Sequence, residues 1–390
     1  MATQRHKPRI LIFSQRNIFT KTLFRCPHYE FEDIISQIDS AEILAPQANL
    51  SDLRHTVATL VAYHAPIALN PGLQRIRVKA HYDLFLAVCG GPKDLLMVNA
   101  VSNWREACNT SVCLIDELWA TQIVNLRYFL RILEKFDVVM LYYRQSVKPL
   151  SERIGRKCVF LPPGVDTTLF CPYPESPKRV VDVFSIGRRS EITHRRLLRM
   201  VTDDGLFYLH DSIAGDQAIA LKEHRALLAT IAKRSRYFIV NPGLIDRPDI
   251  RGDQLEIGNR YFEGAASGVV MVGEHPNNEE FKRLFDWQDA VIHLPYDSSN
   301  IDTIISALDR EPEKQDRIRR TNVVQALMRH DWVYRWEAML KTVGLEPMPE
   351  LVQRKERLRS LAEAVAKGDD AQAGDASERD MVGEGVVDVE

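Results

Sequence analysis

Short runs of apolar residues alternate with longer amphipathic segments along most of this chain. A segment such as 50–64 (LSDLRHTVATLVAYH) places its apolar residues at helical spacing, as do the segments that separate the later runs. Strands that alternate with helices predict a parallel sheet covered by helices. In the first part of the chain the runs of strand length are 9–13, 41–46, 82–89, 111–119 and 136–143.

This alternation stops at residues 161–179 (LPPGVDTTLFCPYPESPKR), where five prolines in nineteen residues disfavour both helix and central strand. A second alternating series starts at 180–187 (VVDVFSIG). We therefore expect an α/β fold of two Rossmann-like domains that face a central cleft, with ligands at the carboxyl ends of the strands. The expected parts are a first domain at 1–160, a hinge at 161–179, a second domain at 180–328, C-terminal helices at 329–366 and an acidic disordered tail at 367–390.

Composition excludes several classes of protein. The 390 residues are 45% hydrophobic and 27% charged, and the formal net charge of -2 gives no reason to expect nucleic acid or an acidic membrane as partner. The six cysteines form neither a zinc motif nor a disulfide framework, which fits a reducing cytoplasm. No apolar run approaches the roughly 18 residues of a membrane span. We expect a cytoplasmic protein, with at most peripheral contact at the inner face of the membrane.

The stretch SIGRRSEITHRR (185–196) combines features of an anion site. Gly187 ends a predicted strand and lets a ligand approach the backbone, and Arg188 supplies a forked donor. A helix that carries His194 and Arg195 begins just after, so its N-terminus adds further donors. The alternative is that these arginines form a solvated helix face.

Other candidates lie next to predicted strands. Residues 256–274 (EIGNRYFEGAASGVVMVGE) place Glu263 beside small residues and directly before a buried strand, although a helical glutamate is commonly just exposed. The polar loop 241–254 follows another strand and begins with Asn241 and Pro242; long loops in compact domains are often functional, but a plain surface loop is equally compatible. In the first domain, topology alone points to Arg16, Asn17, Gly90 and Gly91 as cleft residues on the acceptor side.

Two of these segments resemble a known family. The segment VFLPPGVDTTLFCP (159–172) resembles the interdomain segment of GT-B glycosyltransferases. RYFEGAASGVVMVGE (260–274) resembles the donor-site helix and following strand of the retaining family 4-type enzymes, also called glycosyl transferases group 1. The resemblance covers roughly residues 155–300 and is weak over 1–150. It implies the GT-B fold, with the acceptor bound by the first domain and a nucleotide sugar bound by the second.

The resemblance also implies roles for single residues. Arg188 corresponds to the family arginine that holds the donor diphosphate, and Arg195 is assigned as the second cation because the family position, Thr193, is not basic. Glu263 corresponds to the glutamate that accepts hydrogen bonds from the ribose hydroxyls. Either Glu256, one residue out of register, is the family glutamate that meets the donor sugar, or other groups do so. The remaining donor-side candidates are Gly187 and His194. Asn241 and Pro242 are expected near the base, and Asn259 and Arg260 are the alternatives to Glu256 for meeting the sugar.

The expected function is transfer of a sugar from a nucleotide-diphosphate sugar to a hydroxyl of a carbohydrate, lipid-linked or small-molecule acceptor. Retention, the absence of a metal or other cofactor, and a place in polysaccharide or glycolipid synthesis are implied by the resemblance. Two alternatives stay open. A GT-B-fold sugar-nucleotide epimerase requires an acid and a histidine in the cleft, and a degenerate GT-B scaffold or sugar-nucleotide-binding subunit requires no catalytic group.

Overall fold

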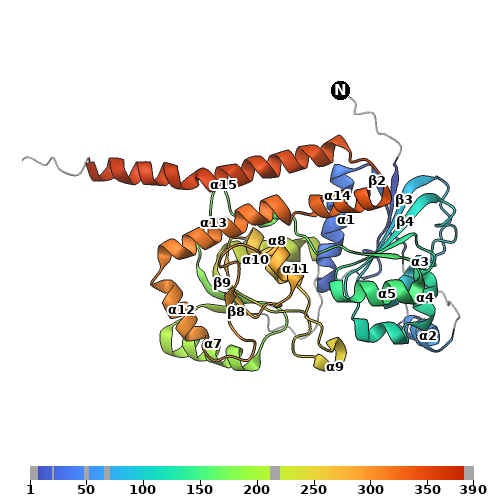
Figure 1. The fold of residues 1–390 in the computed structure, drawn as a ribbon, viewed down its shortest axis with the longest axis horizontal. Helices are drawn as coiled ribbons and strands as arrows, with labels where there is room; N and C mark the ends of the chain where they lie inside the picture. Colours follow the sequence, from blue (N-terminus) through green and yellow to red (C-terminus); the bar gives the residue numbers. More distant parts are fainter. Residues whose placement is uncertain (1–7, 20–21, 48–51, 66–70, 211–219, 382–390) are drawn as a thin grey trace, which may run out of the picture.

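Two parallel sheets form the framework of the protein, as Figure 1 shows. The computed structural model describes residues 8–19, 22–47, 52–65, 71–210 and 220–381. The first sheet has the strand order β2-β1-β3-β4-β5-β6 and the second has the order β11-β10-β9-β7-β8. The first sheet contains β1 (Ile10–Phe13), β2 (Ala41–Leu44), β3 (Tyr82–Cys89), β4 (Cys108–Ile115), β5 (Val138–Leu141) and β6 (Lys157–Phe160).

Helices cover both faces of the first sheet because its strands are apolar on both sides. Along β3, Phe85 and Ala87 enter one buried cluster, whereas Leu84 and Leu86 enter the other. The helices are α1 (Cys26–Ile38), α2 (Asp52–His64), α3 (Leu95–Val98), α4 (Arg127–Leu133) and α5 (Val147–Ile154), with 3₁₀ turns η1 (Leu23–Arg25), η2 (Pro92–Asp94), η3 (Ala120–Asn125) and η4 (Arg144–Ser146).

The second sheet repeats this arrangement. Its strands are β7 (Val181–Ser185), β8 (Tyr208–His210), β9 (Ser235–Val240), β10 (Val270–Gly273) and β11 (Ile292–His293). The helices are α7 (Glu191–Asp204), α8 (Leu221–Lys233), α9 (Pro248–Arg251), α10 (Asn259–Ala266), α11 (Glu279–Leu284), α12 (Ile301–Asp309) and α13 (Pro312–Arg329). Helix α9 lies inside the segment that the sequence predicts as loop.

The chain crosses between the two sheets twice. The proline-rich segment contains a short helix, α6 (Thr167–Phe170), and the backbone of Val165 pairs with that of Asp331 where the chain returns. Helix α14 (Trp332–Val343) then packs on α1 of the first domain, where the Trp332 ring stacks on Phe31 with centroids 4.8 Å apart. Helix α14 therefore belongs in space to the first domain, as its position beside α1 in Figure 1 shows.

The last helix differs from the sequence expectation. Helix α15 (Pro349–Met381) extends beyond residue 367, where the sequence predicts a disordered tail, and residues 382–390 lie outside the described residues. No helix in the described part of the chain is both long and apolar enough to cross a bilayer.

Candidate functional site

A cavity of about 290 Å³ lies between the two domains at the carboxyl ends of both sheets. The segments that follow β4 and β5 line it on one side, and those that follow β7 and β9 line it on the other, together with α8 and the first turn of α10. This is the position expected for a ligand in facing parallel sheets. The structure brings together in this cleft the predicted residues Gly187, Arg188, Asn241, Pro242, Asn259, Arg260 and Glu263.

The loop after β7 carries Arg188, whose long side chain lines the cleft. Gly187 has a φ of +85°, a value that favours glycine, and this turn directs Arg188 toward the loop after β9. There the Arg188 guanidinium pairs with Asp246 at 3.0 Å, and the Arg188 side chain is 51% exposed. An exposed ion pair of this kind is weak, so an anionic ligand can replace Asp246 as the partner of Arg188.

Glu263 is the most deeply buried carboxylate of the cleft, at 1% exposure. Its two carboxylate oxygens accept hydrogen bonds from Arg225 of α8 and from Arg260, one turn earlier on α10. Burial alone raises the pKa of Glu263, but the charges of Arg260 and Arg225 outweigh burial and lower it. Glu263 is therefore an anion held in one orientation.

Small residues decide how closely the helix that carries Glu263 lies on the sheet. A Cβ added to Gly264 lies 2.6 Å from the Met271 Sδ of β10, closer than Cβ atoms come in real structures, so Met271 or the helix has to shift. Ala265 and Ala266 are buried on the same helix. The sequence GAAS therefore permits close contact between α10 and β10, and this contact places Glu263 at the cleft.

Two predicted donor-side residues on α7 lie away from the cleft. The Arg195 side chain is 69% exposed and pairs with Glu191 on the outer surface of α7. His194 packs toward β8, where its Nδ1 lies 3.0 Å from the Tyr208 hydroxyl. Burial, together with the nearby charge of Arg189, lowers the pKa of His194. The expected grouping of Arg188 with Arg195 around one ligand is not found, because the phase of α7 turns Arg195 to solvent.

Glu256 also lies away from the cleft, in a contact between the domains. It is 4% exposed and accepts hydrogen bonds from the backbone N–H groups of Arg144 and Gln145, which begin η4, and from the Gln254 side chain. Burial raises the pKa of Glu256 to about 7. The structure therefore gives Glu256 the contacts of a buried cap for an N-terminal-domain helix instead of contacts with a donor sugar.

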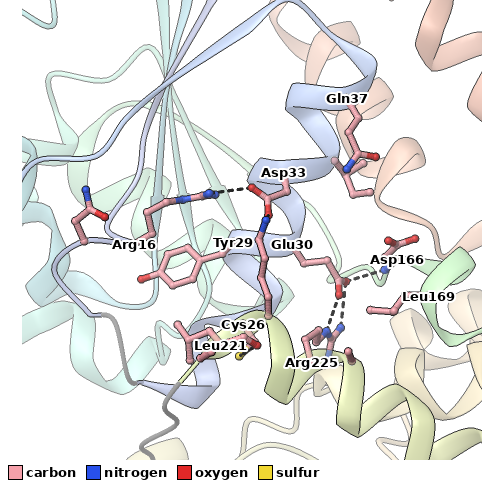
Figure 2. Close-up of a pocket in the computed structure, with 15 residues that line it drawn as sticks. Arg16, Cys26, Tyr29, Glu30, Asp33, Gln37, Asp166, Leu169, Leu221 and Arg225 are labelled. Carbon is pink, nitrogen blue, oxygen red and sulfur yellow. Dashed lines mark hydrogen bonds and ion pairs between the residues drawn. The ribbon is translucent and has the colours of Figure 1, made fainter.

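The acceptor-side candidates divide between two other cavities. Gly90 and Gly91 line a cavity of about 660 Å³ that shares Phe24 and Glu117 with the cleft. Arg16 and Asn17 line a different cavity, of about 550 Å³, between α1 and α8, which Figure 2 shows. The two pairs therefore do not meet one ligand.

Several cleft residues were not predicted from the sequence. Asp116 and Glu117 directly follow β4, and the end of a predicted strand was a signal that could have identified them from the sequence. The Asp116 carboxylate is hydrogen-bonded to the His28 Nε2, 2.8 Å away. His224 and Arg225 project into the cleft from α8, and no local motif marks them. Among the described residues no group of three or more His, Cys, Asp or Glu side chains is arranged to hold a metal ion.

Comparisons with known proteins agree with this architecture. Residues 195–341 match the glycosyl transferase-like family. No curated protein matches the sequence. An α-glucosyltransferase in complex with UDP and a 13-mer DNA containing a central A:G mismatch is 9% identical, with a TM-score of 0.52 over 86% of this chain and 99% of that one.

Two further solved structures are similar. An α-glucosyltransferase in complex with UDP-glucose and DNA containing an abasic site is 10% identical, with a TM-score of 0.51 over 87% of this chain and all (100%) of that one. Anabaena Alr3699/HepE in complex with UDP-glucose is 14% identical, with a TM-score of 0.48 over 86% of this chain and 99% of that one. The two α-glucosyltransferases carry the assignment of the fold. The chain therefore has the GT-B glycosyltransferase fold, with a glycosyl transferase-like segment at residues 195–341.

Proposed function

We propose that this protein transfers a glycosyl unit from a nucleotide-diphosphate sugar to an acceptor hydroxyl. The observation that carries the proposal is the composition of the cleft. Cationic side chains and a buried carboxylate from separate segments converge on one cavity at the carboxyl ends of two parallel sheets. The glycosyl transferase-like match over residues 195–341 covers α8, α10 and the segment that follows β9, which supply part of the lining.

The cleft residues suit the parts of such a donor. Negative charge develops on the diphosphate as the sugar leaves, and Arg188 and Arg260 are positioned to stabilise it. Each oxygen of Glu263 accepts one hydrogen bond from an arginine and so keeps a lone pair for a ribose hydroxyl. Arg260 replaces Arg195 as the second cation in this proposal.

We further propose retention at the anomeric carbon, without a metal or other cofactor. The departing phosphate then accepts the proton of the incoming hydroxyl. The acceptor, in polysaccharide or glycolipid synthesis, enters the cavity of about 660 Å³ beside Glu117. We place the reaction in the cytoplasm, with the domains closing about the hinge to exclude water.

The test is nucleotide binding followed by turnover. Calorimetric titration with UDP, GDP, ADP and CMP identifies the base, and UDP is the first probe because similar folds are known in complex with UDP or UDP-glucose. Hydrolysis of the matching sugar donors is then measured for the wild type, Arg188→Ala and Glu263→Ala, with Arg195→Ala as the control. Loss of binding and turnover in the first two variants only is the expected result. A wild type that binds no nucleotide refutes the proposal, whereas binding without turnover identifies a sugar-nucleotide-binding subunit.

A sugar-nucleotide epimerase is the second candidate, because the cleft holds an acid and histidine set that the sequence did not reveal. His224, Asp116 and Glu117 all line the cavity. Burial, together with the charges of Arg260 and Arg225, lowers the pKa of His224, and burial raises the pKa of Glu117. Incubation of a UDP-sugar without acceptor separates the two reactions, since an epimerase releases an isomeric UDP-sugar that NMR detects.

A further inference from the structure

Arg225 on α8 connects the donor site to the other domain. Its Nε and Nη2 donate to the Glu30 carboxylate of α1 at 2.6 and 3.1 Å, and its Nη1 donates to Glu263. The guanidinium lies over the Phe170 ring, 4.6 Å from its centroid. Figure 2 shows Arg225 reaching Glu30 across the space between α8 and α1. One buried cation therefore joins a carboxylate of the first domain to the carboxylate proposed to bind ribose.

Glu30 is fixed by contacts that have nothing to do with the cleft. Its Oε1 accepts a hydrogen bond of 2.7 Å from the backbone N–H of Asp166, in the segment that links the domains. The same oxygen accepts a hydrogen bond of 2.7 Å from the Trp332 Nε1 of α14. The position of Glu30 is therefore set jointly by α1, the interdomain segment and α14.

In this cluster the negative charges of Glu30 and Glu263 are balanced by two arginines. Arg225 is the arginine that pairs with both carboxylates. Without it Glu263 keeps only Arg260, whose side chain is 31% exposed and lies on the same helix. Burial lowers the pKa of Arg225, but the charges of Glu30 and Glu263 outweigh burial and raise it. A guanidinium is suited to this position because its planar fork reaches two carboxylates at once.

We propose that Arg225 is a positioning residue of the nucleotide site, which orients Glu263 and couples nucleotide binding, through Glu30, to the contact between α1 and α8. The inference rests on the proposed function, since it assigns a nucleotide to Glu263. Linkage requires the coupling to act in both directions. A change at Glu30 alters nucleotide affinity, and a bound nucleotide alters the α1–α8 contact.

The substitution Glu30→Gln separates this link from the other contacts of Glu30. The carbonyl oxygen of a glutamine can still accept from Asp166 and Trp332, whereas its amide N–H groups face the N–H donors of Arg225. The bonds to the oxygen that accepts from the hinge are kept, whereas the shorter bond from the Arg225 Nε to the other carboxylate oxygen, and the negative charge that faces Arg225, are lost. A simple structural role predicts lower stability without any change in how nucleotide binding affects α1.

Asp33→Asn is the matched control. Asp33 lies one turn further along α1 and pairs with Lys222 of α8 at 3.0 Å, so its loss also removes an ion pair between the same two helices. Asp33 additionally pairs with Arg16 and has no bond to Glu263. If the α1–α8 contact as a whole controls binding, this variant behaves like Glu30→Gln.

The experiment measures calorimetric affinity for UDP, GDP and ADP, and hydrogen exchange of α1 with and without the nucleotide that binds. We expect Glu30→Gln to weaken binding about tenfold, and Asp33→Asn to leave it unchanged. Bound nucleotide slows exchange in α1 of the wild type and of Asp33→Asn, but not of Glu30→Gln.

If Glu30→Gln binds the nucleotide as tightly as the wild type, and its α1 is protected from exchange to the same extent, the inference is overturned while the proposed function stands. A wild type that binds no nucleotide overturns the proposed function first. If Glu30→Gln does not fold, wild-type exchange decides, since unchanged α1 protection on nucleotide binding also overturns the coupling.

Discussion

The pH dependence of stability should change when Glu256 is replaced by glutamine. Burial raises the pKa of this carboxyl from 4.5 to about 7, with Glu280 adding to the rise and hydrogen bonds from Gln254 and two backbone N–H groups opposing it. The folded protein then binds more protons than the unfolded chain between pH 4.5 and 7. The free energy of unfolding therefore falls as pH rises through this window, and the full penalty applies above pH 7.

The size of the effect follows from the same values. One pKa unit corresponds to about 1.4 kcal/mol, so a rise from 4.5 to about 7 destabilises the protein by about 3 kcal/mol at pH 8.5. Glu256→Gln removes this penalty because the amide does not ionise. The amide oxygen of the glutamine can still accept the hydrogen bonds from Gln145 and Gln254, although the amide N–H groups then face the backbone N–H of Arg144. We expect the variant to be more stable than the wild type at pH 8.5, by up to about 3 kcal/mol.

Urea denaturation followed by tryptophan fluorescence at pH 5 and pH 8.5 measures the difference. Comparison of the two proteins at each pH cancels all other titrating groups. Glu152→Gln, which removes one carboxylate from an exposed position on α5, is the matched control. A difference between Glu256→Gln and the wild type that is the same at both pH values refutes the reasoning, as does a variant that is less stable at pH 8.5.

Three further predictions concern the cleft and the core. Arg260→Ala should lower kcat/KM by about a hundredfold, while Arg195→Ala changes it little; equal losses in a turnover assay would contradict the placement of α7. Gly273→Ala should abolish soluble folded protein, because the added Cβ lies 1.8 Å from a carbonyl oxygen of β9. The control Gly155→Ala has open space around the added Cβ and only the strain of a positive φ, so it should lower the free energy of unfolding by about 1 kcal/mol in a urea titration. Trp336→Phe should lower the free energy of unfolding by about 1–3 kcal/mol, since it removes the 2.9 Å hydrogen bond to the carboxylate at the end of α1; unchanged stability would show that this bond contributes nothing.

Local sequence was sufficient for the architecture. Alternating apolar and amphipathic segments gave two parallel sheets, and the prolines of 161–179 marked the crossing between them, because these signals depend on residues a few positions apart. Glu263 could also be located from local sequence, since GAAS and the strand VVMVG fix where α10 ends and how closely it packs. Gly187 and Arg188 follow from the end of a strand in the same way.

Tertiary structure decided which other side chains meet in the cleft. Arg195 follows Arg188 closely in sequence, yet the phase of α7 turns it to solvent, while Arg225 reaches Glu263 from a different helix. Glu256 was one of two alternatives for the contact with the donor sugar, and it instead caps a helix of the other domain. The sequence by itself determined the strands, the helices and the ends of strands where a ligand can bind. Only the packing of the two domains, which brings together residues as distant as Glu30 and Arg225, decided which charges are buried and paired.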